Sequence, residues 1–296
     1  MRTLYEGGTF FEGPRWHDGA WYVADMYGPK VLRITPDGVA SAVAELPQRP
    51  SGIGWLPDGS MLVVSMLDRR LMRCTADGRQ EIYVELASHT PWFCNDMVVD
   101  RQGRAWVGNF GFDLFDHAAT PAETTLLRVD PDRRVSVAAD GLRFPNGTVV
   151  TGDGKTLIVA ESFRACLTAF DIGADGALTN RRQHALLGRV PAYHSIEAML
   201  DTDFIPDGCG IDAEDHVWVA DAKGARACRV SPSGQVVQTV HSPNGFGVYA
   251  CVLGGVAGDE LMLCTAPDFD SAKRSASREA VLFVEKVQVR RGAGLP

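Results

Sequence analysis

The sequence has no long apolar run, no basic run and no paired cysteine motif. No stretch reaches the roughly 18 apolar residues that read as a membrane-spanning helix. The first residues, MRTLYEGGTFFEG, lack the apolar core and the small-residue cleavage site of a signal peptide. Seven cysteines without a CxxC pair predict reduced, buried thiols rather than disulfides or a zinc set. These absences favour a cytoplasmic protein that has no membrane partner.

Positive charge is also scarce, since 29 Lys and Arg residues face 37 Asp and Glu residues and give a formal net charge of −8. The two signs are interspersed, which argues against nucleic acid or an anionic membrane as a partner. Several catalytic motifs are missing as well: HExxH, GxSxG, the phosphate-binding glycine loop and the dinucleotide fingerprint. Long helical periodicity is absent, so the chain must be organised by strands.

A hairpin pattern recurs along the chain, with two short apolar strands on either side of an Asp-Gly-like turn. Its clearest copy lies within residues 204–230, FIPDGCGIDAEDHVWVADAKGARACRV, and a third strand follows it. The turn and second strand of the other five copies read DGAWYVAD (18–25), DGSMLVVS (58–65), QGRAWVGN (102–109), DGKTLIVAE (153–161) and GDELMLCT (258–265). Six copies of one unit indicate a repeat architecture.

The spacing of the copies identifies the repeat. Starting positions at residues 13, 52, 96, 147 and 208 are separated by 39, 44, 51 and 61 residues. The shorter values match a propeller blade of about 40–50 residues, and the longer ones leave room for loops. We therefore predict an all-β, six-bladed β-propeller that forms a single domain over residues 1–296. One blade should be completed by both termini, from a strand at 3–5 and strands at 281–284 and 287–289.

Polar residues share one register relative to the turns. Counting back seven or eight residues from each turn reaches the start of the first strand, at Glu12, Ser51, Asn95, Asn146, Asp207 and, in the last copy, Ala250. The innermost strands of a propeller run in one sense beside the central channel. We therefore expect two carboxylates and two amides to converge at one mouth of that channel, with a serine nearby.

Asn-Gly and Asp-Gly pairs are also common turn residues, and a turn is the alternative explanation for Asn146-Gly147. The register argues otherwise, because Asn146 and Asp207 precede the first strand of their hairpins. Two carboxylates with amide oxygens form a hard-oxygen site that suits calcium, magnesium or manganese, with zinc left open. Asp207 has the strongest claim to a chemical role. If one of its oxygens binds a metal, the other can accept a proton from a metal-bound water while the metal polarises a carbonyl.

These residues resemble the SMP-30/gluconolactonase/LRE-like family of six-bladed β-propeller lactonases. The resemblance spans essentially the whole chain and rests on four motifs in the right order. These are Glu12-Gly13-Pro14, Asn95-Asp96 with the following Val99-Asp100, Phe144-Pro145-Asn146-Gly147, and Pro206-Asp207-Gly208 with the strand that ends at Asp221.

The resemblance implies a metal-dependent hydrolase acting on a small-molecule lactone or related ester. It assigns Glu12, Asn146 and Asp207 to one divalent metal ion, with calcium first and manganese, magnesium or zinc as alternatives. Asp207 matches the proposed catalytic acid/base position, and Asn95 matches a residue that contacts substrate.

One position departs from the family. Sugar-lactone members often carry an arginine two residues before the asparagine of blade three, where this chain has Phe93 preceded by Trp92. An aromatic pair does not replace a guanidinium fork. With the aromatic residues of segment 110–123 and the connection before Asp207, Trp92 and Phe93 predict a substrate site that is less polar than one for a sugar lactone. The alternative is that these aromatic side chains only pack the loops.

Two other classes of function are consistent with the same pattern. The first is a calcium-stabilised binding or regulatory propeller, in which the ion is structural and Asp207 is only a ligand. The second is an interaction scaffold with an inert channel, which would not need carboxylates and amides gathered at one mouth. His89, His117, His194 and Glu197 are interpreted as solvated loop residues.

Overall fold

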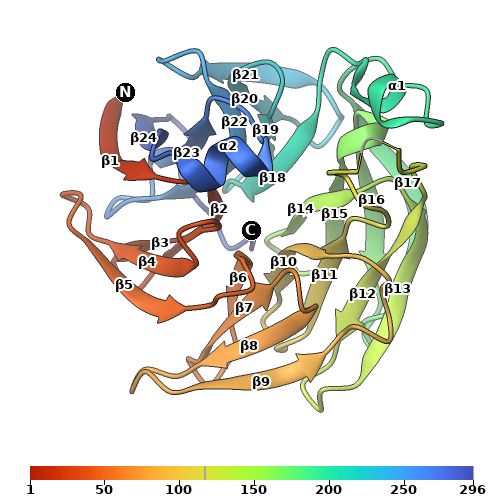
Figure 1. The fold of residues 1–296 in the computed structure, drawn as a ribbon, viewed down its shortest axis with the longest axis horizontal. Helices are drawn as coiled ribbons and strands as arrows, with labels where there is room; N and C mark the ends of the chain where they lie inside the picture. Colours follow the sequence, from red (N-terminus) through yellow and green to blue (C-terminus); the bar gives the residue numbers. More distant parts are fainter. Residues whose placement is uncertain (117, 296) are drawn as a thin grey trace.

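The computed structural model describes residues 1–116 and 118–295. Within them, the strands form six four-stranded antiparallel sheets arranged around a central channel (Figure 1). The predicted all-β, six-bladed propeller is confirmed. Adjacent innermost strands contact one another around the channel, so the core of the molecule is a closed ring of blades.

Five blades run outward from the channel in chain order. The first two are β2 (Phe11–His17), β3 (Ala20–Asp25), β4 (Lys30–Ile34), β5 (Ala40–Glu45), and β6 (Pro50–Trp55), β7 (Met61–Ser65), β8 (Arg70–Cys74), β9 (Gln80–Glu85). The third and fourth are β10 (Cys94–Val99), β11 (Ala105–Asn109), β12 (Thr124–Val129), β13 (Val135–Leu142), and β14 (Pro145–Val150), β15 (Thr156–Glu161), β16 (Cys166–Ile172), β17 (Leu178–Leu186). The fifth is β18 (Pro206–Ile211), β19 (Val217–Asp221), β20 (Arg226–Val230), β21 (Val236–His241). Each of the six predicted hairpins is the inner pair of a blade.

The sixth blade is closed by both ends of the chain. It contains β22 (Gly247–Gly254), β23 (Glu260–Ala266), β24 (Ala280–Lys286) and, as the outermost strand, β1 (Arg2–Gly8). The predicted strand at 287–289 is wrong. Val287 leaves the sheet and donates to Asp259 O at 2.9 Å, and the chain then crosses the rear of the channel, where Leu295 pairs with Val150. Figure 1 shows the C-terminus at the centre of the ring.

The blades pack through their second strands. Trp21, Trp106 and Trp218 each lie on such a strand and are almost fully buried. All seven cysteines fall within the described residues, and all are buried and free, as expected for apolar core residues. No helix in residues 1–116 and 118–295 is long and apolar enough to cross a membrane.

Three long connections gather at the mouth where the inner strands begin. They are segment 110–123, segment 187–205 with helix α1 (Ile196–Leu200), and segment 267–279 with helix α2 (Ser271–Ala276). A short 3₁₀ helix, η1 (Ser162–Arg164), follows β15 at the same mouth. These segments supply walls for the cavity described next.

Candidate functional site

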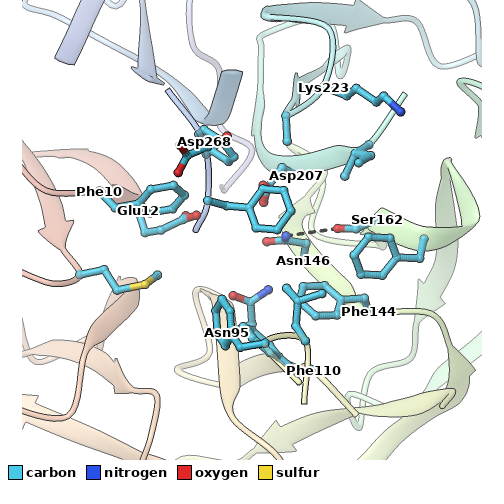
Figure 2. Close-up of a pocket in the computed structure, with 18 of the residues that line it drawn as sticks. Phe10, Glu12, Asn95, Phe110, Phe144, Asn146, Ser162, Asp207, Lys223 and Asp268 are labelled. Atoms are coloured by element: carbon cyan, nitrogen blue, oxygen red, sulfur yellow. Dashed lines mark hydrogen bonds between the residues drawn. The ribbon is translucent and has the colours of Figure 1, made fainter. Parts of the chain in front are cut away.

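Four predicted residues meet in one cavity. Glu12, Asn95, Asn146 and Asp207 are each the second residue of an innermost strand, namely β2, β10, β14 and β18. All four line a cavity of about 360 Å³ at the mouth of the channel. In Figure 2 their side chains converge from four sides of the ring. The shared register therefore predicts their convergence correctly.

The two remaining register positions differ from the expectation. Ser51 is buried, is not among the described residues that line the cavity, and its hydroxyl has no partner within the described chain. The expected Ala250 is wrong, because Tyr249 lines the cavity there. In β22 one residue bulges between the pairs Val248–Thr265 and Ala250–Cys264. β18 also has one extra residue, but its bulge lies between the pairs Pro206–Asp221 and Cys209–Val219. The bulge in β22 therefore lies farther from the turn, and an equal count back reaches a regularly paired residue, Ala250.

The glycines that follow Asn146 and Asp207 are packing residues rather than turn residues. Asn146-Gly147 lies inside β14, and a Cβ on Gly147 would collide with the Cys209 backbone of the neighbouring inner strand. A Cβ on Gly208 would lie 2.5 Å from the Ala250 Cβ. The turn explanation for Asn146-Gly147 is therefore wrong. Close contact between adjacent inner strands brings the residues before these glycines together.

Burial makes the carboxyl groups of the site difficult to ionise. Burial, followed by the charges of Asp207 and Asp96, raises the pKa of Glu12 well above its usual range. Burial and the charge of Asp96 raise the pKa of Asp207 in the same direction, against the backbone of Gly208 and the amide of Asn146. Arg15 lies beneath the site, but its Nη2 is 3.4 Å from Asp96 Oδ1 and it also donates to Met97 O at 2.6 Å. Glu12 and Asp207 thus have less compensating charge than Asp96.

The donors present fit a divalent cation. Asp207 Oδ1 is buried and has no hydrogen-bond partner among the described residues. The Asn146 amide directs its nitrogen towards Ser162, leaving its oxygen towards the centre of the site (Figure 2). No group of three or more His, Cys, Asp or Glu side chains in the described ranges forms a metal cluster. The set here is two carboxylates with amide oxygens, and such oxygen donors suit a hard cation.

Aromatic and aliphatic side chains form most of the cavity wall. Phe10, Phe144 and Ile205 line the cavity two residues before Glu12, Asn146 and Asp207, and the sequence had not predicted them as wall residues. That same register could have identified them. Further wall residues come from several loops: Met26, Tyr27, Met66, Phe110, Leu114, Phe115, Phe163, Leu200, Pro267 and Phe269.

The predicted substrate contacts Trp92 and Phe93 are not among the described residues that line the cavity. Both are partly buried, and the Phe93 ring packs against Phe110 with centroids 5.9 Å apart. Trp92 packs in turn on Phe93 at 6.2 Å. The pair thus supports the wall from behind, because the ring of Phe110 lies between Phe93 and the other wall residues such as Phe144.

The two aromatic connections do come together at the mouth, as expected. Phe110, Leu114 and Phe115 of segment 110–123 line the cavity, and residue 117 lies outside the described residues. Tyr193 joins the two segments, since its hydroxyl donates to Ala122 O at 3.1 Å. The loop residues predicted to be solvated are exposed within the described chain, namely His89, His194 and Glu197.

Comparisons with known proteins agree with this geometry. The profile of the SMP-30/Gluconolactonase/LRE-like region matches residues 10–267. Human regucalcin is 29% identical over 176 residues, which cover 59% of this chain and 54% of regucalcin, so the match spans about half of that protein's length. Pentonolactonase XacC of Haloferax volcanii is 24% identical over 257 residues, covering 86% of this chain and 81% of the relative.

Solved structures share the fold at low sequence identity. A luciferin-regenerating enzyme has a TM-score of 0.78 at 23% identity and covers 98% of this chain and 95% of its own. A gluconolactonase from Xanthomonas campestris has a TM-score of 0.73 at 24% identity, with coverages of 96% and 88%. A calcium-binding regucalcin from Agrobacterium tumefaciens has a TM-score of 0.75 at 18% identity, with coverages of 98% and 97%.

Proposed function

Because the chain belongs to the SMP-30/gluconolactonase/LRE-like family, we propose that it is a metal-dependent hydrolase that opens a lactone or a related ester. The observation that carries this proposal is the convergence of Glu12, Asn95, Asn146 and Asp207 in one cavity, with a buried Asp207 oxygen left without a partner. Relatives named as gluconolactonase and pentonolactonase support the reaction class.

Glu12, Asn146 and Asp207 would hold one divalent cation, with calcium as the first choice and manganese, magnesium or zinc as alternatives. When bound, the cation polarises the substrate carbonyl and lowers the pKa of a bound water. One oxygen of Asp207 would bind the cation, and the other would accept the proton of the attacking water. The buried Asn95 Nδ2 also lacks a described partner and can donate to a substrate oxygen.

We further propose that the substrate carries an apolar portion. The polar residues of the lining are the four converging residues with Ser162, Lys223 and Asp268, whereas Phe10, Phe110, Phe144 and Phe163 form much of the wall. A polyhydroxylated ring would leave its hydroxyl groups facing these rings without partners, which is costly for buried polar groups. An alkyl or aryl substituent would instead gain from burial against them.

A second candidate is a calcium-stabilised binding or regulatory propeller. The regucalcin relatives and the Agrobacterium protein described as calcium-binding favour this reading. In that case Asp207 is only a ligand, and the cation offsets the charge of buried carboxylates without any hydrolysis.

The test is a hydrolysis screen of sugar, alkyl and aryl lactones on chelator-stripped protein, with calcium, manganese, magnesium or zinc restored one at a time. We expect metal-dependent turnover that favours alkyl or aryl lactones. Asp207→Ala and Glu12→Gln should abolish or strongly reduce it, and metal content is measured beside each rate. Ser51→Ala is the matched control, because this buried serine begins an inner strand without lining the cavity, and it should keep wild-type turnover.

The outcomes separate the candidates. No turnover with any metal, together with a tightly bound ion that raises the melting temperature, would select the calcium-stabilised binding protein. Sugar lactones that far outpace alkyl lactones would contradict the apolar substrate and leave the lactonase intact. Full turnover in metal-depleted Asp207→Ala would overturn the mechanism.

A further inference from the structure

Ser162 lies at the junction of two of the proposed metal ligands. It is the first residue of η1, is 2% exposed and lines the cavity. Its hydroxyl oxygen accepts a hydrogen bond from Asn146 Nδ2 at 3.2 Å, drawn as a dashed line in Figure 2. The same hydroxyl donates to Pro206 O at 2.8 Å, and Pro206 directly precedes Asp207. One side chain thus connects the starts of β14 and β18.

The direction of these two bonds is fixed by chemistry. A carbonyl oxygen only accepts, so the single hydroxyl proton of Ser162 is committed to Pro206 O. The hydroxyl oxygen then has only lone pairs to offer to Asn146. Asn146 must therefore present its NH₂ group to Ser162, and its Oδ1 is turned towards the side of Glu12. A flipped amide would place two acceptor oxygens against each other and would direct NH₂ at the cation position.

We propose that Ser162 is a positioning residue that holds the Asn146 amide with its oxygen towards the bound cation. The inference rests on the cation binding in the proposed function and is independent of lactone hydrolysis. Partners that orient metal ligands in this way typically account for about 10–100-fold in metal affinity. Ser162 orients an amide ligand, and an amide has only one oxygen atom that can bind a cation, whereas a carboxylate has two.

A nucleophilic role for Ser162 does not fit the geometry. A serine nucleophile needs a base that accepts its proton. Among the described residues, the Ser162 hydroxyl donates to a backbone carbonyl, and no histidine or carboxylate accepts a hydrogen bond from it. The Ser162 proton is therefore held by Pro206 O, which fixes the direction of the hydrogen bond between Ser162 and Asn146.

The test is a double-mutant cycle on calcium affinity, measured by titration calorimetry on the chelator-stripped full chain. The variants are Ser162→Ala, Asn146→Asp and the double variant. Ser162→Ala should weaken calcium binding by about 10-fold or more in the native background. In the Asn146→Asp background it should have less than about a 3-fold effect, because both oxygens of a carboxylate can bind and orientation no longer matters.

Two further variants control for folding. Ser162→Thr keeps the hydroxyl and should retain affinity within about 3-fold, whereas Ser162→Cys keeps the volume with a weaker hydrogen bond and should lose affinity like Ser162→Ala. Should Ser162→Ala fail to fold, the comparison of Ser162→Cys with Ser162→Thr carries the test. Ser51→Ala, a buried serine outside the cavity, should bind calcium as the native protein does.

Each result decides the inference. Native affinity in Ser162→Ala, or an equal loss in the Asn146→Asp background, would overturn the orienting role and leave cation binding intact. A native protein that binds none of the four cations would instead overturn the proposed function at its metal site, and the role of Ser162 with it.

Discussion

The floor of the cavity holds more negative charge than its neighbours offset. Glu12, Asp96 and Asp207 are buried close together, and Arg15 is the guanidinium paired with one of them, Asp96. The raised pKa values of Glu12 and Asp207 express the cost of ionising both without a cation. A ligand that binds only the folded state stabilises that state by mass action. Cation binding should therefore raise the stability of the ring as well as prepare the site.

His184 lies on the outer strand β17, away from the site, and makes the stability of the folded protein depend on pH. Burial first, and then the charge of Arg182, lowers the pKa of His184 from its ordinary 6.5. Below pH 6.5 the unfolded chain therefore binds a proton that the folded protein resists, so stability is full above 6.5 and falls as the pH drops. We expect His184→Gln to reduce the loss of melting temperature between pH 7.5 and 5.5.

The reduction should be partial, because burial also lowers the pKa of His17, with Asp18 opposing and Arg291 adding to the shift. The matched control is His194→Gln, since His194 is exposed in the loop before α1, and it should keep the native pH slope. Melting curves followed by circular dichroism at five pH values measure the effect. An unchanged slope in His184→Gln would contradict the assignment.

At individual positions, the sequence predicts the polar residues of the site better than the residues of the cavity wall. Glu12, Asn95, Asn146 and Asp207 were found because one register repeats in four hairpins. Tyr249 was missed because the bulge in β22 lies farther from the turn than the bulge in β18, and the position of a bulge is not encoded by the hydrophobic pattern. The direction of the Phe93 ring likewise depends on packing against Phe110, a long-range contact that spacing does not reveal.

In three blades the second strand ends in a carboxylate that binds the segment leading into that blade. Asp25 accepts from Thr9 N at 2.9 Å, and Glu161 from Arg143 N at 2.8 Å. Asp221 accepts from Ile205 N and Lys223 N, both at 3.2 Å, and from Arg226 Nε at 2.9 Å. Because these residues satisfy backbone donors of the segment just before an inner strand, they hold the starts of β2, β14 and β18 in place.

Asp221→Ala tests this fastening in the fifth blade. Asp221 is 0% exposed, so its removal leaves buried donors without a partner and should lower the free energy of unfolding by roughly 2–5 kcal/mol. We also expect faster amide hydrogen exchange at residues 203–205, which include the cavity wall residue Ile205. The control is Asp171→Ala, which removes an exposed carboxylate paired with Arg182 and should change neither quantity.

Native amide exchange at residues 203–205 in a folded Asp221→Ala protein would show that other contacts hold the segment. The inner hairpins were predictable because a period-2 apolar pattern and an Asp-Gly-like turn are local signals. The paths of segments 110–123 and 187–205 were not, since contacts such as Tyr193 with Ala122 join residues 71 positions apart.

The ring is closed at two places. One is the sheet of the sixth blade, and the other is the mouth of the channel opposite the cavity, which we call the rear. In the sheet, β1 pairs with β24 and covers an edge that would otherwise expose unpaired backbone groups. Across the rear, residues 290–295 bind three neighbouring blades through Val150, Ala213 and Gly258. The sequence predicted closure by both termini, but the rear crossing could not be foreseen, because its partners are turn backbones without a residue signature.

The rear crossing should contribute stability without contributing to the cation site. Its four backbone hydrogen bonds are Ala213 N to Arg290 O, Arg291 N to Gly258 O, and the reciprocal pair between Val150 and Leu295, all 2.8–2.9 Å long. At about 0.5–1.5 kcal/mol each, deleting residues 290–296 should cost about 2–6 kcal/mol in urea unfolding. The side chains proposed to bind the cation lie at the opposite mouth of the channel. Calcium affinity should therefore stay within about 3-fold of native under conditions where the ring remains folded.

Deleting residues 1–8 is the contrasting variant. It removes a whole strand from the closing blade and leaves the edge of β24 open for pairing with other chains. This variant should lose cooperative unfolding and aggregate, whereas the rear deletion should unfold in one transition at lower urea. A native urea midpoint after the rear deletion would mean that water replaces those four bonds without cost. A large fall in calcium affinity would mean instead that the two mouths are mechanically coupled through the inner strands.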